Sequence, residues 1–315
     1  MEYTHKPVLL DACIQALNIR PDGVYVDGTL GRAGHSLEIA RRLTTGRLIC
    51  IDRDQAAIDA AKVRLAPYLD RVTLVHSNFS ELKEVLSAAG VSGADGMLFD
   101  LGVSSPQLDY ASRGFSYMQD APLDMRMDTA APLTAYEVVN TWPQEELRRI
   151  LYEYGEERYA PAIAKAIVRA RETAPVKTTL ELVEIIKGAM PPAALREKQH
   201  PAKRSFQAIR IAVNGELDAL PPMLRAAVDG LNPGGRLAVI TFHSLEDRIV
   251  KRTLAEQARG CTCPPEFPVC VCGKKPRIRL VNRKPITADQ AELSDNPRAR
   301  SAKLRVAEKC DPFDL

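Results

Sequence analysis

The chain has 315 residues, of which 45% are hydrophobic and 26% are charged, and its net charge at pH 7 is +3. This composition can build a large core, so it excludes a disordered or fibrous protein and favours one large domain or two coupled ones. No apolar run approaches the ~18 residues that cross a bilayer, and no stretch of signal-peptide type precedes Asp11. We therefore expect a cytoplasmic protein with no membrane partner.

The first hundred residues alternate between short apolar strands and helical patterns. The sequence predicts strands at 24–26, 47–51, 72–76 and 97–101, and helices at 35–43 and 55–65. Strands and helices that alternate at this spacing indicate a parallel sheet with helices on both faces. We expect a doubly wound α/β fold.

A long insertion separates this series from the next strand. The strand at 236–242 follows the turn signal Asn232-Pro233-Gly234-Gly235 and stands about 130 residues after Leu101, whereas a βαβ crossover can be built from ~30. The intervening sequence predicts helices with capping boxes, which pair Thr134 with Glu137, Thr141 with Gln144, and Thr178 with Glu181. One packed helix face is predicted by the spacing of Leu147, Ile150, Leu151 and Tyr154.

We therefore predict that residues 1–107 and 208–315 form the sheet domain and that 108–207 form an inserted helical subdomain. Two alternating runs, 277–281 and 302–307, predict an antiparallel pair at the sheet edge. The segment 273–309 has eleven Lys and Arg against four Asp and Glu, which leaves −4 on the remainder. Such a basic end suits contact with nucleic-acid phosphates, and a solvated surface is the alternative.

A glycine-rich turn follows the first strand and reads Asp27-Gly28-Thr29-Leu30-Gly31-Arg32-Ala33-Gly34-His35. Glycines permit close backbone approach, and the helix that follows directs N–H groups at a ligand. The carboxylate of Asp27 would repel a pyrophosphate and attract an amino group. This favours a zwitterionic ligand, such as the methionine part of S-adenosylmethionine, over a dinucleotide.

Two further positions extend the candidate ligand site. Asp52 ends the second strand about twenty residues after the turn, where a carboxylate can accept both hydroxyls of a ribose. The alternative is that Asp52 caps the next helix, a role for which Asp54 is better placed. Phe79 follows the third strand and either stacks on adenine or belongs to the core.

The fourth strand leads to Asp100 and then to Ser105-Pro106-Gln107-Leu108. An exocyclic base amine becomes nucleophilic only as its nitrogen pyramidalises. Transfer of a group to this nitrogen therefore needs hydrogen-bond acceptors around it, and Ser105 is our candidate acceptor. Methyltransferases for base amines place (Ser/Asn/Asp)-Pro-Pro-aromatic here. Gln107 and Leu108 stand where the second proline and the aromatic residue would be.

Several segments point together to a more specific family. They are His5 to Leu10, Asp27 to His35, Asp100 to Asp109, Arg113 to Ser116, Pro122 to Asp128, Arg204 to Leu217, Phe242 to Arg248, and Asn296 to Ser301. In these segments the chain resembles the RsmH (MraW) family of bacterial 16S rRNA cytosine-N4 methyltransferases. The resemblance implies a class I (Rossmann-like) S-adenosylmethionine-dependent methyltransferase sheet with an inserted all-helical subdomain for substrate recognition.

The same resemblance implies the reaction, the partner and the cofactor contacts. The reaction is methylation of the N4 amine of a decoding-region cytidine in 16S rRNA, within the small ribosomal subunit, by an RNA-binding transferase that takes part in rRNA processing. No DNA partner is expected. The implied cofactor-binding residues are Ala33, Gly34, His35, Asp52, Phe79, Asp100 and Gln107. The family usually has glycine at Ala33, and we expect the methyl group to be tolerated there at negative φ.

The stretch after Gln107 interleaves aromatic residues with arginines, which suits a splayed single-stranded base. Its members are Asp109, Tyr110, Arg113, Phe115, Tyr117 and Arg126. The alternative is a packed connection between subdomains. Lys203, Arg204 and Arg210 extend the basic track, and His243 after the fifth strand is expected to be structural.

Four of the seven cysteines stand close together, at Cys261, Cys263, Cys270 and Cys272. In a cytoplasmic chain such crowding favours a structural zinc ion over disulfides, and four reduced surface thiols are the alternative. Zinc here would fix the loop before the basic edge strands and direct Arg277, Arg279 and Arg283 towards rRNA. Cys13 and Cys50 lie in apolar runs and are expected in the core.

Two other functions remain open at this stage. A DNA amine methyltransferase would share the cofactor chemistry, and a cofactor-binding RNA chaperone would share the basic surface without activity. Methyl transfer to an undermethylated small subunit distinguishes all three.

Overall fold

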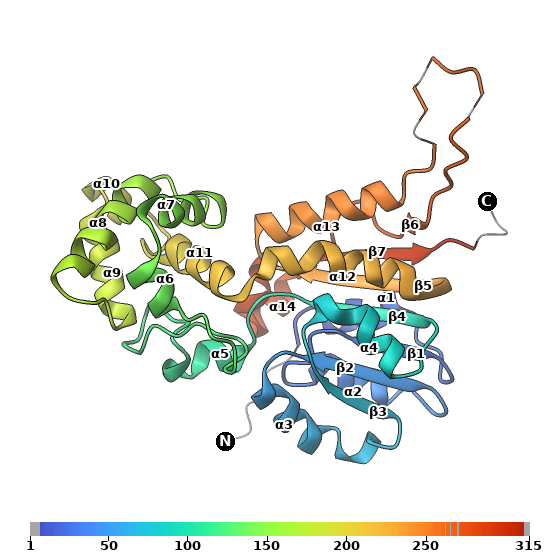
Figure 1. Cartoon of the computed structure of the whole chain (residues 1–315). Coiled ribbons are helices and arrows are strands. Elements are labelled where there is room, and N and C mark those ends of the chain that lie inside the picture. Colours follow the sequence, from blue (N-terminus) through green and yellow to red (C-terminus); the bar gives the residue numbers. More distant parts are fainter. Residues whose placement is uncertain (1–6, 262, 265, 270, 312–315) are drawn as a thin grey trace. The chain divides into compact units, whose positions relative to one another are not determined.

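A computed structural model describes residues 7–261, 263–264, 266–269 and 271–311. The chain divides into two compact units, one of Met1–Gly102 with Leu217–Leu315 and one of Val103–Glu216. In Figure 1 the first unit contains the labelled strands, and the second contains the green and yellow helices α5 to α11. The sequence placed the insertion at 108–207. The helical unit is wider at both ends, and Val103 and Val213, which lie outside the predicted bounds, pack in its core.

The first unit is built on a mixed sheet, which has seven strands within the described residues. These are β1 (Val24–Asp27), β2 (Arg47–Asp52), β3 (Val72–His76), β4 (Ala94–Asp100), β5 (Leu231–Thr241), β6 (Ile278–Leu280) and β7 (Lys303–Lys309). Their order is β3-β2-β1-β4-β5-β7-β6. The first five pair in parallel, and β7 is antiparallel to both β5 and β6. The predicted doubly wound sheet with an antiparallel edge pair is confirmed.

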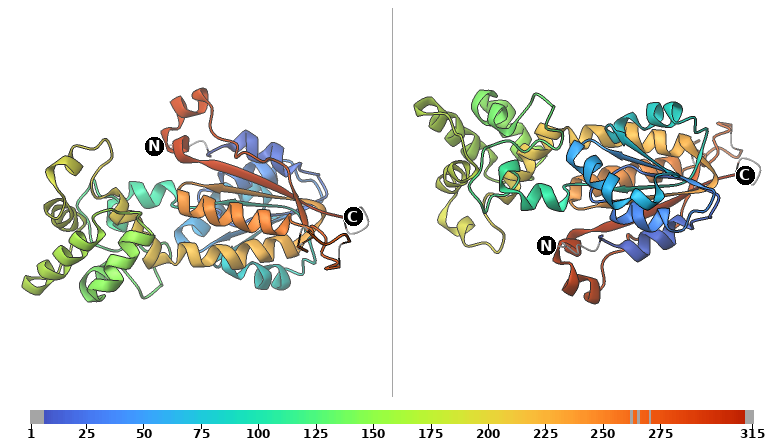
Figure 2. Two further views of the ribbon diagram at one scale, coloured as in Figure 1. Left: turned by 90° about the horizontal axis from the view of Figure 1, so that it is seen from above. Right: turned by 90° about the horizontal axis from the view of Figure 1, so that it is seen from below.

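Helices cover both faces of this sheet (Figure 2). They are α1 (Leu10–Leu17), α2 (Gly34–Ala40), α3 (Gln55–Arg64), α4 (Leu82–Ala88), α12 (Glu216–Gly230) and α13 (Ser244–Gln257). The short α14 (Gln290–Asp295) has no buried residue. The strand residues alternate between the two cores, as the pleat requires. Ile49 and Ile51 pack in the core that includes residues of α4, α12 and α13. Leu48 and Cys50 pack in the other core with Cys13, which confirms both cysteines as core residues.

The predicted turn at 232–235 is part of a strand instead. β5 begins at Leu231, and its register against β4 shifts between Ala94 and Gly96. Gly234 takes a φ of +76° at this irregularity, where glycine avoids the strain of a side chain. The side-chain amide of Asn232 donates to Asp95 at 3.0 Å and fixes the bulged segment.

The second unit is helical. Its α-helices are α5 (Ser105–Asp109), α6 (Ala135–Thr141), α7 (Gln144–Glu153), α8 (Ala160–Thr173), α9 (Thr179–Gly188), α10 (Pro192–Leu195) and α11 (Lys203–Asn214). Leu147, Ile150 and Leu151 of α7 are buried in one core with residues of α6, α8, α9 and α11, which confirms the predicted packed face. No helix in the described part of the chain is long and apolar enough to cross a membrane.

Two of the three predicted capping boxes are confirmed, at Thr134 and at Thr178. The third was wrong. Thr141 is the last residue of α6, where its hydroxyl donates to the carbonyl of Glu137 at 2.6 Å, and Pro143 occupies the N-cap of α7. Proline fits this place because the first N–H groups of a helix have no partner in the helix.

Candidate active site at the carboxyl ends of β1, β2 and β4

The glycine-rich turn after β1 fits tightly against its neighbours. A Cβ atom at Gly28 would lie 2.2 Å from the ring of Phe99, and one at Gly34 would lie 2.3 Å from Cγ of Pro7. Gly31 has a φ of +49°, which favours glycine. Two of these glycines therefore serve close packing and one serves backbone conformation. His5 and Lys6, which precede Pro7 in the matching segment, lie outside the described residues.

Ala33 has a φ of +57° and a ψ of +31°, so the negative φ at which we expected its methyl group to be tolerated is not observed. The left-handed conformation costs a residue with a Cβ roughly 1–2 kcal/mol. Two backbone hydrogen bonds hold Ala33 there, from its own N–H to Leu30 at 2.7 Å and from Leu37 to its carbonyl at 3.0 Å. Positive φ explains why the family usually has glycine at this position. This chain adopts the same conformation with alanine.

Asp27 is almost fully buried and is used by the turn itself. Its carboxylate accepts from the Ser36 hydroxyl at 2.5 Å and from the Thr29 N–H at 3.2 Å. Burial raises the pKa of Asp27 to about 6, and these two hydrogen bonds oppose the rise. We expected the Asp27 carboxylate to attract a ligand amino group. In the structure it stabilises the loop through Ser36 and Thr29 instead.

Asp52 lies where the loop meets the end of β2. Its Oδ2 accepts from the Gly31 N–H at 2.7 Å, and its Oδ1 accepts from the Asp54 N–H at 2.9 Å. Burial raises the pKa of Asp52 to about 6. Because a carboxylate has about four lone-pair sites, both oxygens can still accept from a ligand. The capping role falls to Asp54, which accepts from the Ala56 N–H at 3.1 Å, as the sequence indicated.

Asp100 ends β4, and its pKa is raised further than those of Asp27 and Asp52. Its Oδ1 is buried and has no hydrogen-bond partner within the described structure. Burial first, and then the charges of Asp27 and Glu246, raise the pKa of Asp100 to about 8. A half-buried carboxyl group with an unused acceptor and a raised pKa is typical of a ligand site.

Thr29 is a site residue that the sequence analysis missed. Its Oγ1 accepts from the N–H of Asp100 at 2.5 Å and so fastens the β1 turn to the end of β4. The signal was its place between Gly28 and Gly31, because a hydroxyl in a tight turn commonly bonds nearby backbone.

His35 is buried at the start of α2, and its Nε2 lies 3.0 Å from the carbonyl of Val8. A carbonyl can only accept, so Nε2 carries the proton and donates. Burial lowers the pKa of His35 to about 4, which keeps the ring neutral at pH 7. Its Nδ1 is 3.9 Å from Oδ2 of Asp100. The predicted role of His35 in cofactor binding stays a prediction.

Phe79 begins the short 3-10 helix 79–81 after β3. It is half-buried and packs edge-to-face on Phe99, with ring centroids 6.2 Å apart. One part of the ring therefore belongs to the core, and stacking of the rest on adenine stays a prediction.

Ser105 and Gln107 belong to the helical unit, in α5. Oε1 of Gln107 accepts from the N–H of Ser104 at 2.9 Å, so this side chain helps to begin the helix. Gln107 is buried there. The predicted roles of Ser105 in catalysis and of Gln107 in cofactor binding stay predictions.

The stretch after Gln107 is largely the packed connection that we kept as the alternative. Arg113 donates to the carbonyls of Arg126 and Met127 at 2.9 Å, and Arg126 forms a paired contact with Asp124 at 2.8 and 3.0 Å. Phe115 lies in the core of the helical unit. These side chains stabilise the loop through their contacts within the helical unit. Tyr110, by contrast, is 59% exposed.

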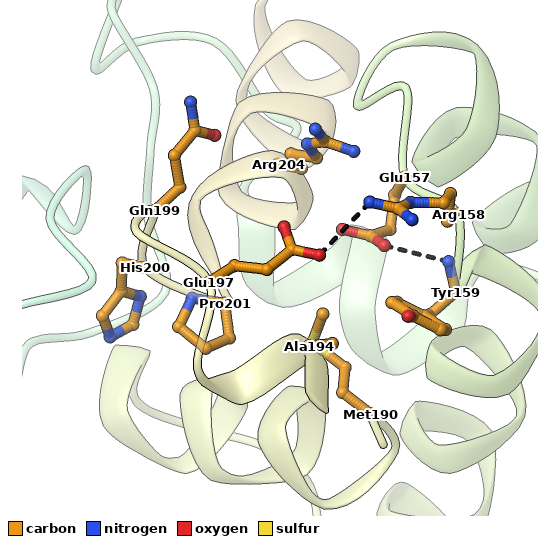
Figure 3. A pocket seen from close by; sticks show the side chains of 10 residues that line it. All are labelled: Glu157, Arg158, Tyr159, Met190, Ala194, Glu197, Gln199, His200, Pro201 and Arg204. Carbon is orange, nitrogen blue, oxygen red and sulfur yellow. Dashed lines mark hydrogen bonds and ion pairs between the residues drawn. The ribbon is translucent and has the colours of Figure 1, made fainter. Parts of the chain in front are cut away.

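A small pocket of the helical unit opens between the end of α9, the α10–α11 connection and the start of α8 (Figure 3). Arg158 and Glu197 pair across it at 3.2 Å, and Arg204 donates to the carbonyl of Glu156 at 3.0 Å. Beside it, the ring of His200 stacks on Tyr117 with centroids 4.6 Å apart. Arg210, which we expected in the same basic track, is instead paired with Glu216 at 2.8 Å.

Several cations of the basic C-terminal segment are neutralised within the sheet unit. Arg305 contacts Asp247 through two hydrogen bonds at 2.7 and 3.2 Å. Arg277 pairs with Asp229, and Arg279 pairs with Glu308. Arg277 and Arg279 thus contact acids of their own unit, and Arg279 is still 71% exposed at its side chain. The orientation of Arg277, Arg279 and Arg283 towards rRNA stays a prediction.

His243 precedes α13 and has the structural place that we expected. Glu246 accepts from the backbone N–H groups of Phe242 at 2.8 Å and of His243 at 3.3 Å. The His243 ring lies 3.2 Å from the same carboxyl group. His243 and Glu246 together begin the helix.

The sheet and the site together define the class of protein. The strand order, with antiparallel β7 between β5 and β6, is that of class I S-adenosylmethionine-dependent methyltransferases, and the carboxyl groups gather beside the point where the strand order reverses between β1 and β4. The chain belongs to the MraW methylase family, whose model matches residues 2–310.

Full-length relatives agree with this family. The chain is 59% identical over 314 residues to ribosomal RNA small subunit methyltransferase H of Paenibacillus sp. (strain JDR-2), with 98% of this chain and 99% of the relative covered. It is 58% identical over 310 residues to the protein of the same name from Brevibacillus brevis, at the same coverage of both chains. Among solved structures, an rRNA methylase from Streptococcus thermophilus has a TM-score of 0.40 and 11% identity, over 96% of this chain and 94% of that one.

Proposed function

We propose that this protein transfers the methyl group of S-adenosylmethionine to the N4 amine of a decoding-region cytidine in the 16S rRNA of the small ribosomal subunit. The match to the family model over 2–310 carries the proposal. The names of relatives at 58–59% identity, ribosomal RNA small subunit methyltransferase H, support small-subunit rRNA as the substrate. The N4 amine is supported by the resemblance of the segment from Asp100 to Asp109.

The residues at the strand ends fit this cofactor. S-adenosylmethionine carries two positive groups, an ammonium and a sulfonium, whereas a dinucleotide carries phosphates that Asp27, Asp52 and Asp100 would repel. The unpartnered Oδ1 of Asp100 suits a cationic donor. Asp52 keeps acceptor capacity for the two ribose hydroxyls. The N–H groups of Gly34 and His35, in the first turn of α2, suit the cofactor carboxylate.

The chemistry asks for positioning more than for acid and base catalysis. When bound, the cofactor supplies a methyl group on a sulfonium, which is electrophilic without further activation. We assign to Ser105 the acceptance of a hydrogen bond from the cytosine amine, which frees the nitrogen lone pair for in-line attack. The methylated amine is acidic while it still carries its extra proton, so water can take that proton and no strong base is required.

We propose that the helical unit contributes the rRNA surface around the Tyr117–His200 pair. Residues 187–204 include five Lys and Arg and one acid. Lys203 and Arg204 lie in the first turn of α11, where the helix dipole is also positive, so an anion is favoured. Burial and the charge of Lys187 lower the pKa of His200, which keeps its ring neutral for stacking. Stacked rings beside cations suit a single-stranded RNA segment.

Transfer of labelled methyl groups tests this function. Small subunits from a strain that lacks the modification, free 16S rRNA and duplex DNA are the three substrates. We expect incorporation into 16S rRNA, and a comparison of the first two shows whether the assembled subunit is needed. Incorporation into DNA would favour the DNA enzyme. Cofactor binding without transfer to any of the three would favour the RNA chaperone.

A further inference from the structure

Three cysteine side chains meet within a long excursion of the sheet unit. The Sγ atoms of Cys261, Cys263 and Cys272 all lie within 4.8 Å of one another. Those of Cys261 and Cys272 are 3.8 Å apart. Cys270, the fourth member of the sequence pattern, lies outside the described residues. The cluster is thus formed by side chains that are two to eleven positions apart in the chain.

The sulfur separation matches metal coordination. Zinc–sulfur bonds of about 2.3 Å arranged as a tetrahedron place neighbouring sulfur atoms roughly 3.8 Å apart. A disulfide would require about 2.05 Å between the two atoms. The observed 3.8 Å therefore fits two thiolates on one ion and does not fit a bond between them.

Backbone amides support charge on these sulfur atoms. The N–H of Cys263 donates to Sγ of Cys261 at 3.4 Å, and the N–H of Val271 donates to Sγ of Cys263 at 3.3 Å. Hydrogen bonds of this kind orient metal ligands and stabilise the thiolate form that binds zinc. Two of the three sulfur atoms thus accept from the same segment that supplies the ligands.

The segment has little else to order it. It runs from the end of α13 at Gln257 to the start of β6 at Ile278 and projects beyond both elements in Figure 1. Its ends are closed by a hydrogen bond of 2.9 Å from the Arg277 N–H to the Gln257 carbonyl. Between them Phe267, Val269 and Val271 are 51–72% exposed, so the described residues of the segment form no apolar core. Small units without a core commonly depend on a metal or disulfides.

We propose that Cys261, Cys263 and Cys272 supply three thiolate ligands to one structural zinc ion. The ion closes the excursion and holds the neighbouring chain entering β6. Beside that strand lies a pocket lined by Arg279, Arg283 and Lys309, among others. The zinc ion acts on the shape of this basic region and takes no part in methyl transfer.

Metal analysis of the full chain, purified without added metal or chelator, tests the site. We expect about one equivalent of zinc in the wild type and in Cys310→Ser, which alters a thiol outside the cluster, and a loss of most of it in Cys263→Ser. Unchanged affinity for S-adenosylmethionine shows that the variant is folded. Zinc far below one equivalent in the wild type, with rapidly reacting thiols, overturns the proposal, and so does full retention by Cys263→Ser.

Limited trypsin digestion gives a second measurement that needs no variant. Lys274 is exposed in the excursion, so a chelator should speed cleavage after it, and added zinc should reverse the effect. Cleavage elsewhere in the chain serves as the internal control. Equal rates at Lys274 with and without the chelator contradict the proposed structural task.

Discussion

The backbone N–H of Gly31 donates to Oδ2 of Asp52 at 2.7 Å, and this hydrogen bond joins the glycine-rich turn after β1 to the end of β2. Asp52 thereby serves two purposes. It fixes the turn through Gly31, and it keeps acceptor sites for a ligand hydroxyl. A substitution at Asp52 should therefore disturb cofactor binding in two ways, by loss of an acceptor and by release of the turn.

Asp52→Ala should weaken S-adenosylmethionine binding by about 1–3 kcal/mol, because ribose hydroxyls are left without an acceptor. Isothermal titration calorimetry measures this loss. Asp54→Asn is the matched control, since asparagine caps a helix as well as aspartate does and the same charge is removed two residues away. An equal loss of affinity in both variants would mean that net charge, and not the acceptor at Asp52, governs binding.

Asp100→Asn should stabilise the ligand-free protein at pH 8. Asp100 has its pKa raised from 3.8 to about 8, so the folded state keeps a proton that the unfolded state releases. Its contribution to the free energy of unfolding is therefore full below pH 4 and falls as the pH rises towards 8. Urea unfolding at pH 5 and pH 8 should show a variant advantage that grows with pH, on the order of 1 kcal/mol or more.

The same variant should bind S-adenosylmethionine more weakly, because an amide cannot replace the carboxylate next to a cationic group.

The contribution of His35 to stability has the opposite pH dependence to that of Asp100. Its pKa is lowered from 6.5 to about 4, so its contribution is lost as the pH falls through this range. The urea experiment also tests the state of Asp100. If the difference in unfolding free energy between wild type and Asp100→Asn is constant from pH 5 to pH 8, Asp100 is ionised over this whole range.

The sequence predicted most of the fold because local patterns and tertiary packing agree in the sheet unit. The strand at 72–76 and the antiparallel pair near 278–280 and 303–309 lie where their alternation placed them. The third capping box failed for a local reason. Thr141 and Gln144 have the right spacing, yet Pro143 lies between them, and α6 continues through Thr141.

The candidate site was harder to predict, because the use of each polar side chain depends on its partners. Asp27 carries the same functional group as Asp52, but Ser36 and Thr29 occupy its buried carboxylate. Arg126 fits the composition of an RNA-binding loop, yet Asp124 engages it. The left-handed φ of Ala33 could not be predicted from alanine itself, which has a Cβ and rarely adopts positive φ, and the glycine that the family usually has at this position was the available signal.

Ser105→Ala should keep cofactor affinity and slow methyl transfer by about tenfold or more, because it removes the acceptor proposed for the target amine. Single-turnover rates with saturating S-adenosylmethionine and undermethylated small subunits measure the effect. Ser116→Ala, which removes a hydroxyl elsewhere in the helical unit, is the control. If Ser105→Ala reacts at the wild-type rate, Ser105 is not the acceptor, and backbone carbonyls would accept the hydrogen bonds of the amine instead.

Lys203→Ala should weaken binding to 16S rRNA fragments and reduce the slope of log affinity against log salt by about 1, since one phosphate contact is lost. Filter binding at several salt concentrations gives both quantities. Arg148→Ala is the control, because Arg148 lies in α7 and pairs with Glu145 at 2.8 Å. The proposed surface is contradicted if both variants change the slope equally.

The most direct measurement of the central claim is mass spectrometry of the nucleosides in 16S rRNA after reaction of undermethylated small subunits with the protein and S-adenosylmethionine. Our account predicts one new N4-methylated cytidine species, located in a fragment of the decoding region, and no such product with Asp100→Asn at the same cofactor concentration. Methylation at ring carbon, ring nitrogen or ribose oxygen, or N4-methylcytidine outside the decoding region, would contradict it.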